Sequence, residues 1–144
     1  VGVNARRGTV THEVQHAPHS PHGLPAGKCA VYVFSLSESY GARCPAGPNR
    51  VLKVGKARPK SDARFRSQHY NPHSAGSTLA GSLVDTRILW AYLAVSNMND
   101  ANVKLWITSS TDRDNFYLAA AEAFLLNELE RYIKGRLGPV FEGG

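Results

Sequence analysis

Two short apolar runs, joined by a loop rich in glycine and proline, constrain the fold of this chain most. The first run, Cys29 to Leu36, is rich in β-branched and aromatic residues and is too short for a convincing helix. The second run spans Arg50 to Gly55, and the stretch between the two holds two glycines and two prolines. The pattern predicts an antiparallel hairpin with a long loop.

Alternation of side chains along each strand predicts which residues of the hairpin share a face. Tyr32 shares its face with Phe34 and Leu36, and Lys53 shares its face with Val51 and Gly55. A suitable register between the two strands places Tyr32 beside Lys53.

Three later segments complete an α+β domain with a small three-stranded antiparallel sheet flanked by helices. A short helix is expected between Pro59 and the Asn71-Pro72 pair. Val103 to Thr108 alternates as expected of a third strand. The Ala-rich stretch from about Asn115 to Leu137 predicts the longest helix, with Gly138-Pro139 beyond its end.

The length of 144 residues fits one domain preceded by an arm. Residues 1–26 are rich in Gly, Pro and His and lack apolar periodicity, which predicts a flexible N-terminal arm or linker before a domain over 27–144. Four histidines in the arm can be interpreted as metal ligands or as solvated polar residues. Pro18 and Pro21 would disrupt a helix there, which favours the solvated interpretation. Residues 71–102, with a helical run from near Ser77, are expected to form an insertion.

The formal net charge of +6 favours a polyanionic partner, with nucleic acid ahead of an anionic membrane. No window approaches the roughly 18 apolar residues of a spanning helix, and the N-terminus lacks the apolar core of a signal peptide. We therefore expect a soluble, cytoplasmic protein without a membrane partner. Cys29 and Cys44 are too few to suggest a disulfide scaffold and are expected to be reduced.

Four chemical groups in this order are those that a phosphodiesterase needs. The phenol of Tyr32, the amine of Lys53, the guanidinium of Arg64 and a late carboxylate can together activate a nucleophile, bind a phosphate and hold one divalent ion. Glu122 falls in the apolar stripe of the expected long helix, where a carboxylate is costly unless it is paired or binds a metal. Glu130 lies nearer the edge of that stripe.

These residues resemble the GIY-YIG nuclease family over roughly residues 29–142. The matching segments, in order, are Ala30-Val31-Tyr32 for the first strand motif, Lys53-Val54-Gly55 for the second, Arg64 with the trailing His69 and Tyr70 for the Arg motif, Glu122 with its following apolar residues, and Pro139-Val140-Phe141 for the terminal motif. Arg66 is the alternative to Arg64 if the register slips.

The chain departs from the family pattern in four places. The first motif lacks its Gly and Ile, and Lys53 replaces the second Tyr, as in some restriction enzymes of the family. Glu142 stands where the family has Asn. Glu130 lies at the more usual distance from Pro139, so it is the alternative to Glu122 as the metal ligand.

The resemblance implies a metal-dependent endonuclease that leaves 5′-phosphate and 3′-hydroxyl ends, with DNA as the first expectation. One Mg²⁺ or Mn²⁺ ion would be held by Glu122 and waters, Tyr32 would be the general base assisted by Lys53, and Arg64 would bind the phosphate. His69 or Tyr70 would support the nucleophile. The residues expected to contact the nucleic-acid backbone are Arg50, Lys56, Arg58, Lys60 and Arg66.

Two other functions remain open from the sequence. One is a non-catalytic, basic nucleic-acid-binding module derived from a nuclease, and the other is an RNA-cleaving toxin or effector. A symmetric double-strand cut would require two single-metal sites, so a restriction-like role predicts a homodimer or transient pairing on DNA. A nicking role does not.

Overall fold

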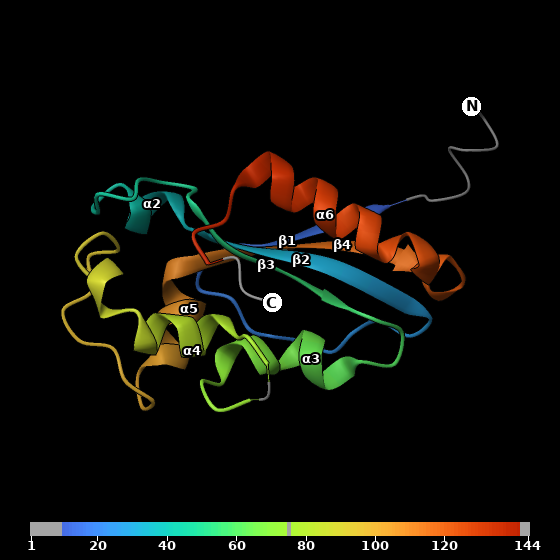
Figure 1. Cartoon of the computed structure of the whole chain (residues 1–144), viewed down its shortest axis with the longest axis horizontal. Helices are drawn as coiled ribbons and strands as arrows, with labels where there is room; N and C mark the ends of the chain where they lie inside the picture. Colours follow the sequence, from blue (N-terminus) through green and yellow to red (C-terminus); the bar gives the residue numbers. More distant parts are fainter. Residues whose placement is uncertain (1–9, 75, 142–144) are drawn as a thin grey trace.

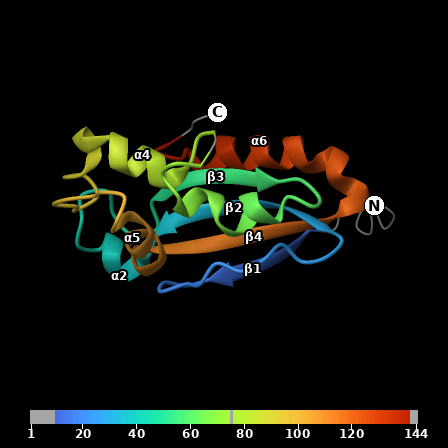
Figure 2. The same cartoon turned by 90° about the horizontal axis from the view of Figure 1, so that it is seen from below.

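A computed structural model describes residues 10–74 and 76–141, in which four antiparallel strands form one sheet in the order β1-β4-β2-β3. Figure 2 shows this order across the sheet, with β3 and β1 at opposite edges. The strands are β1 (Thr11–Gln15), β2 (Lys28–Leu36), β3 (Val51–Ala57) and β4 (Thr111–Ala119). The α+β class is therefore confirmed, but the expected three-stranded sheet is wrong by one strand.

Helices lie on both faces of this sheet (Figure 1). α6 covers the face that carries Val31 and Val33, while α3, η1, α4 and α5 cover the face that carries Tyr32 and Phe34. The central strand β2 is buried on both faces. The helical segments are α2 (Glu38–Gly41), α3 (Asp62–Arg66), η1 (Gln68–Tyr70), α4 (Leu79–Asp85), η2 (Arg87–Leu89), α5 (Val103–Ser110), η3 (Ala120–Leu125) and α6 (Leu126–Leu137), where η denotes a 3₁₀ helix.

The predicted hairpin is confirmed as β2 and β3, which pair in antiparallel fashion. Tyr32 lies opposite Gly55 and Phe34 lies opposite Lys53, so Lys53 is a diagonal neighbour of Tyr32 on the same face. Diagonal neighbours lie about 7–8 Å apart, which is within reach of a long side chain. An irregularity between Phe34 and Ser35 then shifts the register. Val51 consequently packs on the α6 face, so the prediction that it shares a face with Lys53 is wrong.

The prediction of an N-terminal arm over 1–26 is wrong for its described part, residues 10–26, while residues 1–9 lie outside the described residues. β1 pairs with β4, and His19 is buried. Both nitrogens of His19 form hydrogen bonds, with the Thr111 carbonyl oxygen at 2.9 Å and the Tyr70 hydroxyl at 2.7 Å. The polar sequence of β1 hides the strand, because its side chains make polar contacts instead of packing an apolar face.

Two further predictions are wrong: a segment expected to be a strand is a helix, and a segment expected to be helical is a strand. Val103–Ser110, expected to contain the third strand, is helix α5, because Val103, Ile107 and Ser110 are buried at helical spacing. The long helix does not begin near residue 115, because residues 111–119 form β4. The inward face of β4 carries Arg113 and Asn115, so it lacks the apolar alternation by which strands are recognised.

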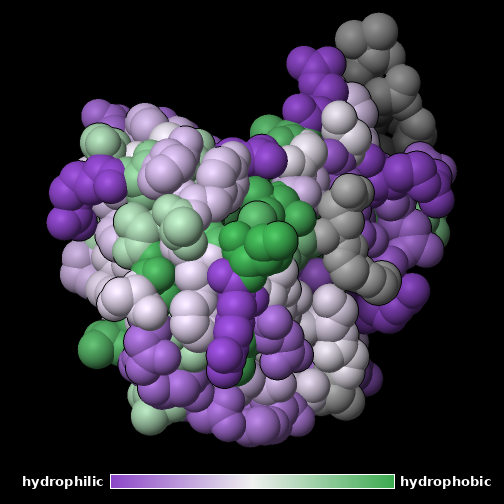
Figure 3. All heavy atoms as spheres, turned by 60° about the vertical axis from the view of Figure 1, so that its left-hand side comes forward, coloured by the Kyte–Doolittle hydropathy of each residue, from purple (hydrophilic) through white to green (hydrophobic). Residues whose placement is uncertain are grey.

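The helical end of the molecule contains residues 71–102, the expected insertion. The helix expected from Ser77 is shorter than predicted: α4 ends at Asp85 and is followed by η2 and turns. Figure 3 brings this end forward and shows hydrophobic side chains scattered among hydrophilic ones. Ile88 and Leu105 are its most exposed large apolar residues.

The segment after α6 returns to β3. Gly138 ends α6 in a left-handed conformation (φ 55°), which glycine adopts without strain. The Val140 and Phe141 amides then donate to the Val51 and Leu52 carbonyl oxygens, and Phe141 is buried. Glu142 lies outside the described residues. Within the described ranges, no helix has the length and apolar character needed to span a membrane.

Candidate active site

Gly55 allows Tyr32 and His69 to lie close together against β3. A Cβ atom at position 55 would lie 2.7 Å from Tyr32 Cε1 and 2.9 Å from His69 Nε2, closer than real contacts allow. The Tyr32 hydroxyl points between the carbonyl oxygens of Lys56 and Arg64, at 3.4 and 3.5 Å. The missing side chain at position 55 therefore makes room for a phenol and an imidazole side by side.

Tyr32 is fully buried, and burial raises its pKa to about 12. The positive charges of Arg64 and Arg113 act in the opposite direction, while the negative charge of Glu130 raises the pKa further. Positive charge close to the ring is consequently what makes ionisation of Tyr32 less costly.

His69 is buried and neutral. Its Nδ1 accepts a hydrogen bond from the Leu79 amide at 3.1 Å, so the neutral ring carries its proton on Nε2. Nε2 has no hydrogen-bond partner within the described residues. Burial, together with the charges of Arg64, Lys53 and Arg113, lowers the pKa of His69 to about 3. His69 therefore presents an N–H donor beside Tyr32 and cannot serve as a base through that nitrogen.

Lys53 is buried at 2% exposure, and its amine donates to Ser77 Oγ at 3.0 Å. Burial, followed by the charges of Lys134 and Arg64, lowers the pKa of Lys53 to about 8. An amine with this pKa exists in both charged and neutral forms close to neutral pH. It is the candidate site residue best suited to accept a proton there.

Arg64 connects α3 to β3 and remains partly exposed. Its Nε donates to the Lys56 carbonyl oxygen at 2.9 Å, and its Nη1 donates to Gln68 Oε1 at 3.2 Å. The charge of Arg64 acts on Tyr32, Lys53 and His69. The structure thus brings these four predicted residues together.

Glu130 reaches the same edge from the opposite face of the sheet. β3 is an edge strand, and the carboxylate of Glu130 lies between Lys56 at 3.3 Å and Lys134 at 3.6 Å. Its charge acts on both Tyr32 and Lys53. The hollow beside it, of about 570 Å³, is lined by Lys56, Asn127, Glu130, Arg131, Lys134 and Gly135.

Glu122 lies elsewhere. The premise that placed it in the apolar stripe of a long helix is wrong, because Glu122 belongs to the 3₁₀ segment η3 and has non-helical backbone angles. Its charge acts on Cys29 at the beginning of β2, and it is not among the groups that shift the pKa of Tyr32 or Lys53. Of the two carboxylates, Glu130 is the one whose field reaches this constellation.

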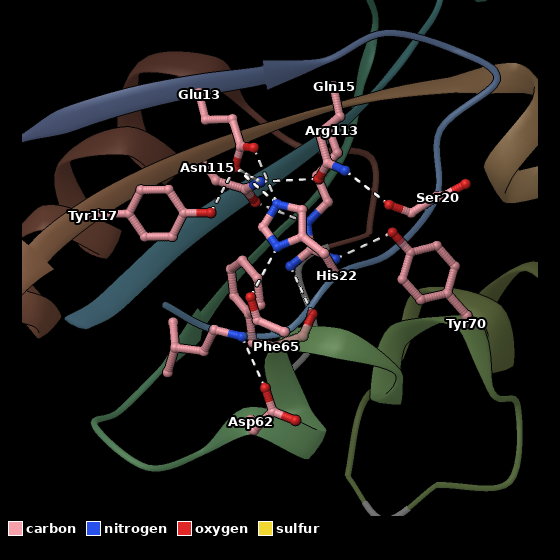
Figure 4. A network of polar contacts seen from close by, with 12 residues as sticks. Glu13, Gln15, Ser20, His22, Asp62, Phe65, Tyr70, Arg113, Asn115 and Tyr117 are labelled. Atoms are coloured by element: carbon pink, nitrogen blue, oxygen red, sulfur yellow. Dashed lines mark hydrogen bonds and ion pairs between the residues drawn. The ribbon is translucent and has the colours of Figure 1, made fainter. Parts of the chain in front are cut away.

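Tyr70 belongs to a buried network instead of the β3 edge (Figure 4). Its hydroxyl accepts from Arg113 Nη1 at 3.1 Å and contacts His19 Nε2 at 2.7 Å. Asn115 links the same arginine to Glu13 on β1. No pattern in the sequence indicated this network, because β1 and β4 were not recognised as strands.

The five predicted backbone contacts divide into two groups. Arg58, Lys60 and Arg66 are exposed around the turn and helix that follow β3. Lys56 is paired with Glu130, and Arg50 donates to the Gly138 carbonyl oxygen at 3.0 Å. Arg131 and Lys134 were missed, although they lie four and seven residues after Asn127, the spacing of one helix face.

Substitution of Gly55 tests the close packing at β3. Gly55→Ala is expected to destabilise the protein by about 1–3 kcal/mol, because Tyr32 and His69 have to move. Gly135→Ala is the matched control: no heavy atom lies within 4 Å of its Cβ position, so alanine in α6 should stabilise by about 0.5–1 kcal/mol. Urea unfolding of both variants measures the difference. Equal effects would contradict the geometry.

The buried neutral His69 predicts how stability depends on pH. Its pKa is about 3 in the folded protein against 6.5 ordinarily, so the unfolded chain binds an extra proton between these values. Stability should fall as pH decreases through this window, with a slope approaching about 1.4 kcal/mol per pH unit. The free energy of unfolding, plotted against pH between pH 7 and pH 4, should fall more steeply for the wild type than for His69→Asn. This variant keeps a hydrogen-bond acceptor but does not titrate. Parallel curves would show that His69 ionises without cost.

Comparison with models of known protein families, with curated proteins and with solved structures finds no match for this chain. The functional interpretation therefore depends on the geometry of the β3 edge.

Proposed function

We propose that the protein is a metal-dependent endonuclease that hydrolyses phosphodiester bonds of nucleic acid, with DNA as the preferred substrate. The observation that carries the proposal is the meeting of Tyr32, Lys53 and Arg64 with Glu130 across the edge strand β3. The basic hollow beside Glu130 supports it, since lysine and arginine side chains attract phosphate groups. The order of the elements also supports the proposal. Two strands (β2 and β3) are followed by α3 with Arg64, by β4 and by α6 with Glu130, which is the order that the resemblance implies.

The residues present fit one hard divalent cation. The described residues contain no group of three or more His, Cys, Asp or Glu side chains suited to a metal. Mg²⁺ nevertheless commonly takes one or two carboxylates, with waters and substrate phosphates completing its shell. Glu130 is the carboxylate proposed to hold Mg²⁺ or Mn²⁺, and it would exchange its contacts with Lys56 and Lys134 for the ion. When bound, the ion would neutralise phosphate charge and stabilise the departing 3′ oxygen.

The protein's own groups would move the protons. Neutral Lys53 accepts the proton of Tyr32, and the phenolate accepts a proton from water as the water oxygen attacks phosphorus. The bond from phosphorus to the 3′ oxygen breaks, and that oxygen takes a proton from solvent, which leaves 5′-phosphate and 3′-hydroxyl ends. Arg64 donates to the phosphate oxygens as their charge grows.

The transfer from Tyr32 to Lys53 is uphill on its own. Their pKa values are about 12 and about 8, a gap that corresponds to about 5 kcal/mol. Positive charge beside the phenolate is required to reduce this gap, and Arg64 supplies part of it. Since Tyr32 and Lys53 are closed to solvent, the water and phosphate would approach from the β3 edge, where Arg64 and Glu130 are partly exposed.

Cleavage assays with two carboxylate variants test the proposal. Supercoiled plasmid, single-stranded DNA and RNA are incubated with Mg²⁺, Mn²⁺ or EDTA. We expect metal-dependent cleavage of DNA that Glu130→Gln reduces at least about 10²-fold, because the variant loses the metal-binding charge. Glu122→Gln is the matched control and should cleave at close to the wild-type rate.

Each of the other possible results points to a different metal ligand or a different function. Loss of cleavage in Glu122→Gln alone would restore Glu122 as the metal ligand. Cleavage confined to RNA would favour a toxin or effector, and tight binding without cleavage would favour the non-catalytic binding module. Nicked plasmid fits a monomer, whereas linear product at once fits a dimer or pairing on DNA. A DNA substrate and the two free cysteines both fit an intracellular location.

The pKa of Lys53 predicts the pH dependence of cleavage. If its neutral amine accepts the proton, kcat/KM should rise about tenfold per pH unit below about 8 and level off above it. Lys53→Arg stays charged, so its rate should fall by about 10²-fold or more and lose this rise. Lys104→Arg on exposed α5 should match the wild type. A Lys53→Arg variant with the full wild-type profile would show that another group accepts the proton.

A further inference from the structure

Arg113 is a buried cation that the proposed chemistry above leaves without a role. It lies on β4 with 1% of its surface exposed. Its guanidinium donates to Asn115 Oδ1 at 2.8 Å, to the Tyr70 hydroxyl at 3.1 Å and to the Phe65 carbonyl oxygen at 2.7 Å (Figure 4). All three acceptors are neutral.

Within residues 10–74 and 76–141, no carboxylate lies within ion-pair distance of Arg113. The closest link to an anion is indirect, since Asn115 donates onward to Glu13 Oε1 at 3.0 Å. A buried charge is costly unless it is paired or fully hydrogen-bonded. The guanidinium therefore retains most of its positive field inside the core.

Aromatic rings surround this charge. The guanidinium carbon lies 4.3 Å from the Phe65 ring centroid and 4.5 Å from that of Tyr32, with Phe34 and Tyr70 farther away at 5.2 and 5.9 Å. Tyr32 is the ring among these that the proposed function requires to ionise. Arg64, the other cation that acts on Tyr32, is partly exposed, so solvent screens its charge. Arg113 is buried, so its charge is not screened in this way.

We propose that Arg113 is a positioning residue for Tyr32, whose buried guanidinium fixes the ring and supplies the unscreened positive charge that stabilises the phenolate. The use of this phenolate in cleavage rests on the proposed function, but the coupling between Arg113 and Tyr32 does not. The ionisable groups that also interact with these two residues are Arg64, Tyr70, Tyr117, Glu130, His69 and His19, together with Glu13 through Asn115.

A titration of the phenol at position 32 tests the coupling directly. Tyr32 is replaced by 3,5-difluorotyrosine, whose more acidic phenol ionises at a pH where the protein is folded, and its single ¹⁹F signal is followed against pH. Arg113→Gln should raise the pKa of this phenol by about one unit or more, since a charge within about 4–6 Å produces shifts of this size. Arg113→Lys keeps the charge and should restore most of the shift. Arg87→Gln, at the exposed end of η2, is the control and should leave the signal unchanged.

Thermal unfolding establishes that each variant is folded before it is titrated. If Arg113→Gln does not fold, Asn115→Asp keeps the arginine and places a carboxylate on its Nε, which should raise the phenol pKa by neutralising the field. A phenol pKa that stays within about 0.2 units in every folded Arg113 and Asn115 variant would overturn the proposal. The titration requires neither nucleic acid nor metal, so its outcome is independent of whether the protein cleaves DNA.

Discussion

Arg113 connects β4 to α3 and η1, two of the segments that cover its face of the sheet. Its guanidinium bonds the Phe65 carbonyl oxygen in α3 and the hydroxyl of Tyr70 in η1. The Tyr70 hydroxyl is hydrogen-bonded in turn to His19, and Asn115 donates a hydrogen bond to Glu13 on β1. Without the guanidinium, three neutral acceptors, on Phe65, Tyr70 and Asn115, would lose a common donor. The position of α3, and hence of Arg64, depends on this interaction.

The second constraint is the edge position of β3. A central strand separates the two faces of a sheet, but at an edge the side chains from both faces can act on one point. Lys53 and Arg64 approach this point from the face covered by α3, and Glu130 approaches it from α6. Gly55 contributes by having no side chain, which lets the Tyr32 ring lie against the strand. A phosphate bound at this edge would therefore meet groups that the sheet otherwise keeps apart.

The sequence predicted those strands whose core-facing residues are mostly apolar. The β2 and β3 hairpin was recognised because its core face is apolar, and its same-face assignment of Tyr32, Lys53 and Gly55 is confirmed. β1 and β4 were missed because their inward faces carry Glu13, Arg113 and Asn115, which are satisfied by one another and leave no alternating pattern. That miss moved the start of the last helix and made Glu122 look like a residue of its apolar stripe. Glu130 was already the alternative, and it is the carboxylate that acts on Tyr32.

The position of a bound ion shows whether the site lies at the β3 edge. Mn²⁺ is added to ¹⁵N-labelled protein with a short, non-cleavable phosphorothioate duplex, and paramagnetic broadening of each backbone amide is measured. If the ion binds at the β3 edge, broadening should be strongest for Lys56, Asn127 and Glu130, which line the hollow beside β3. Broadening centred on Glu122 and the rest of η3, or broadening without any centre, would contradict a site at the β3 edge.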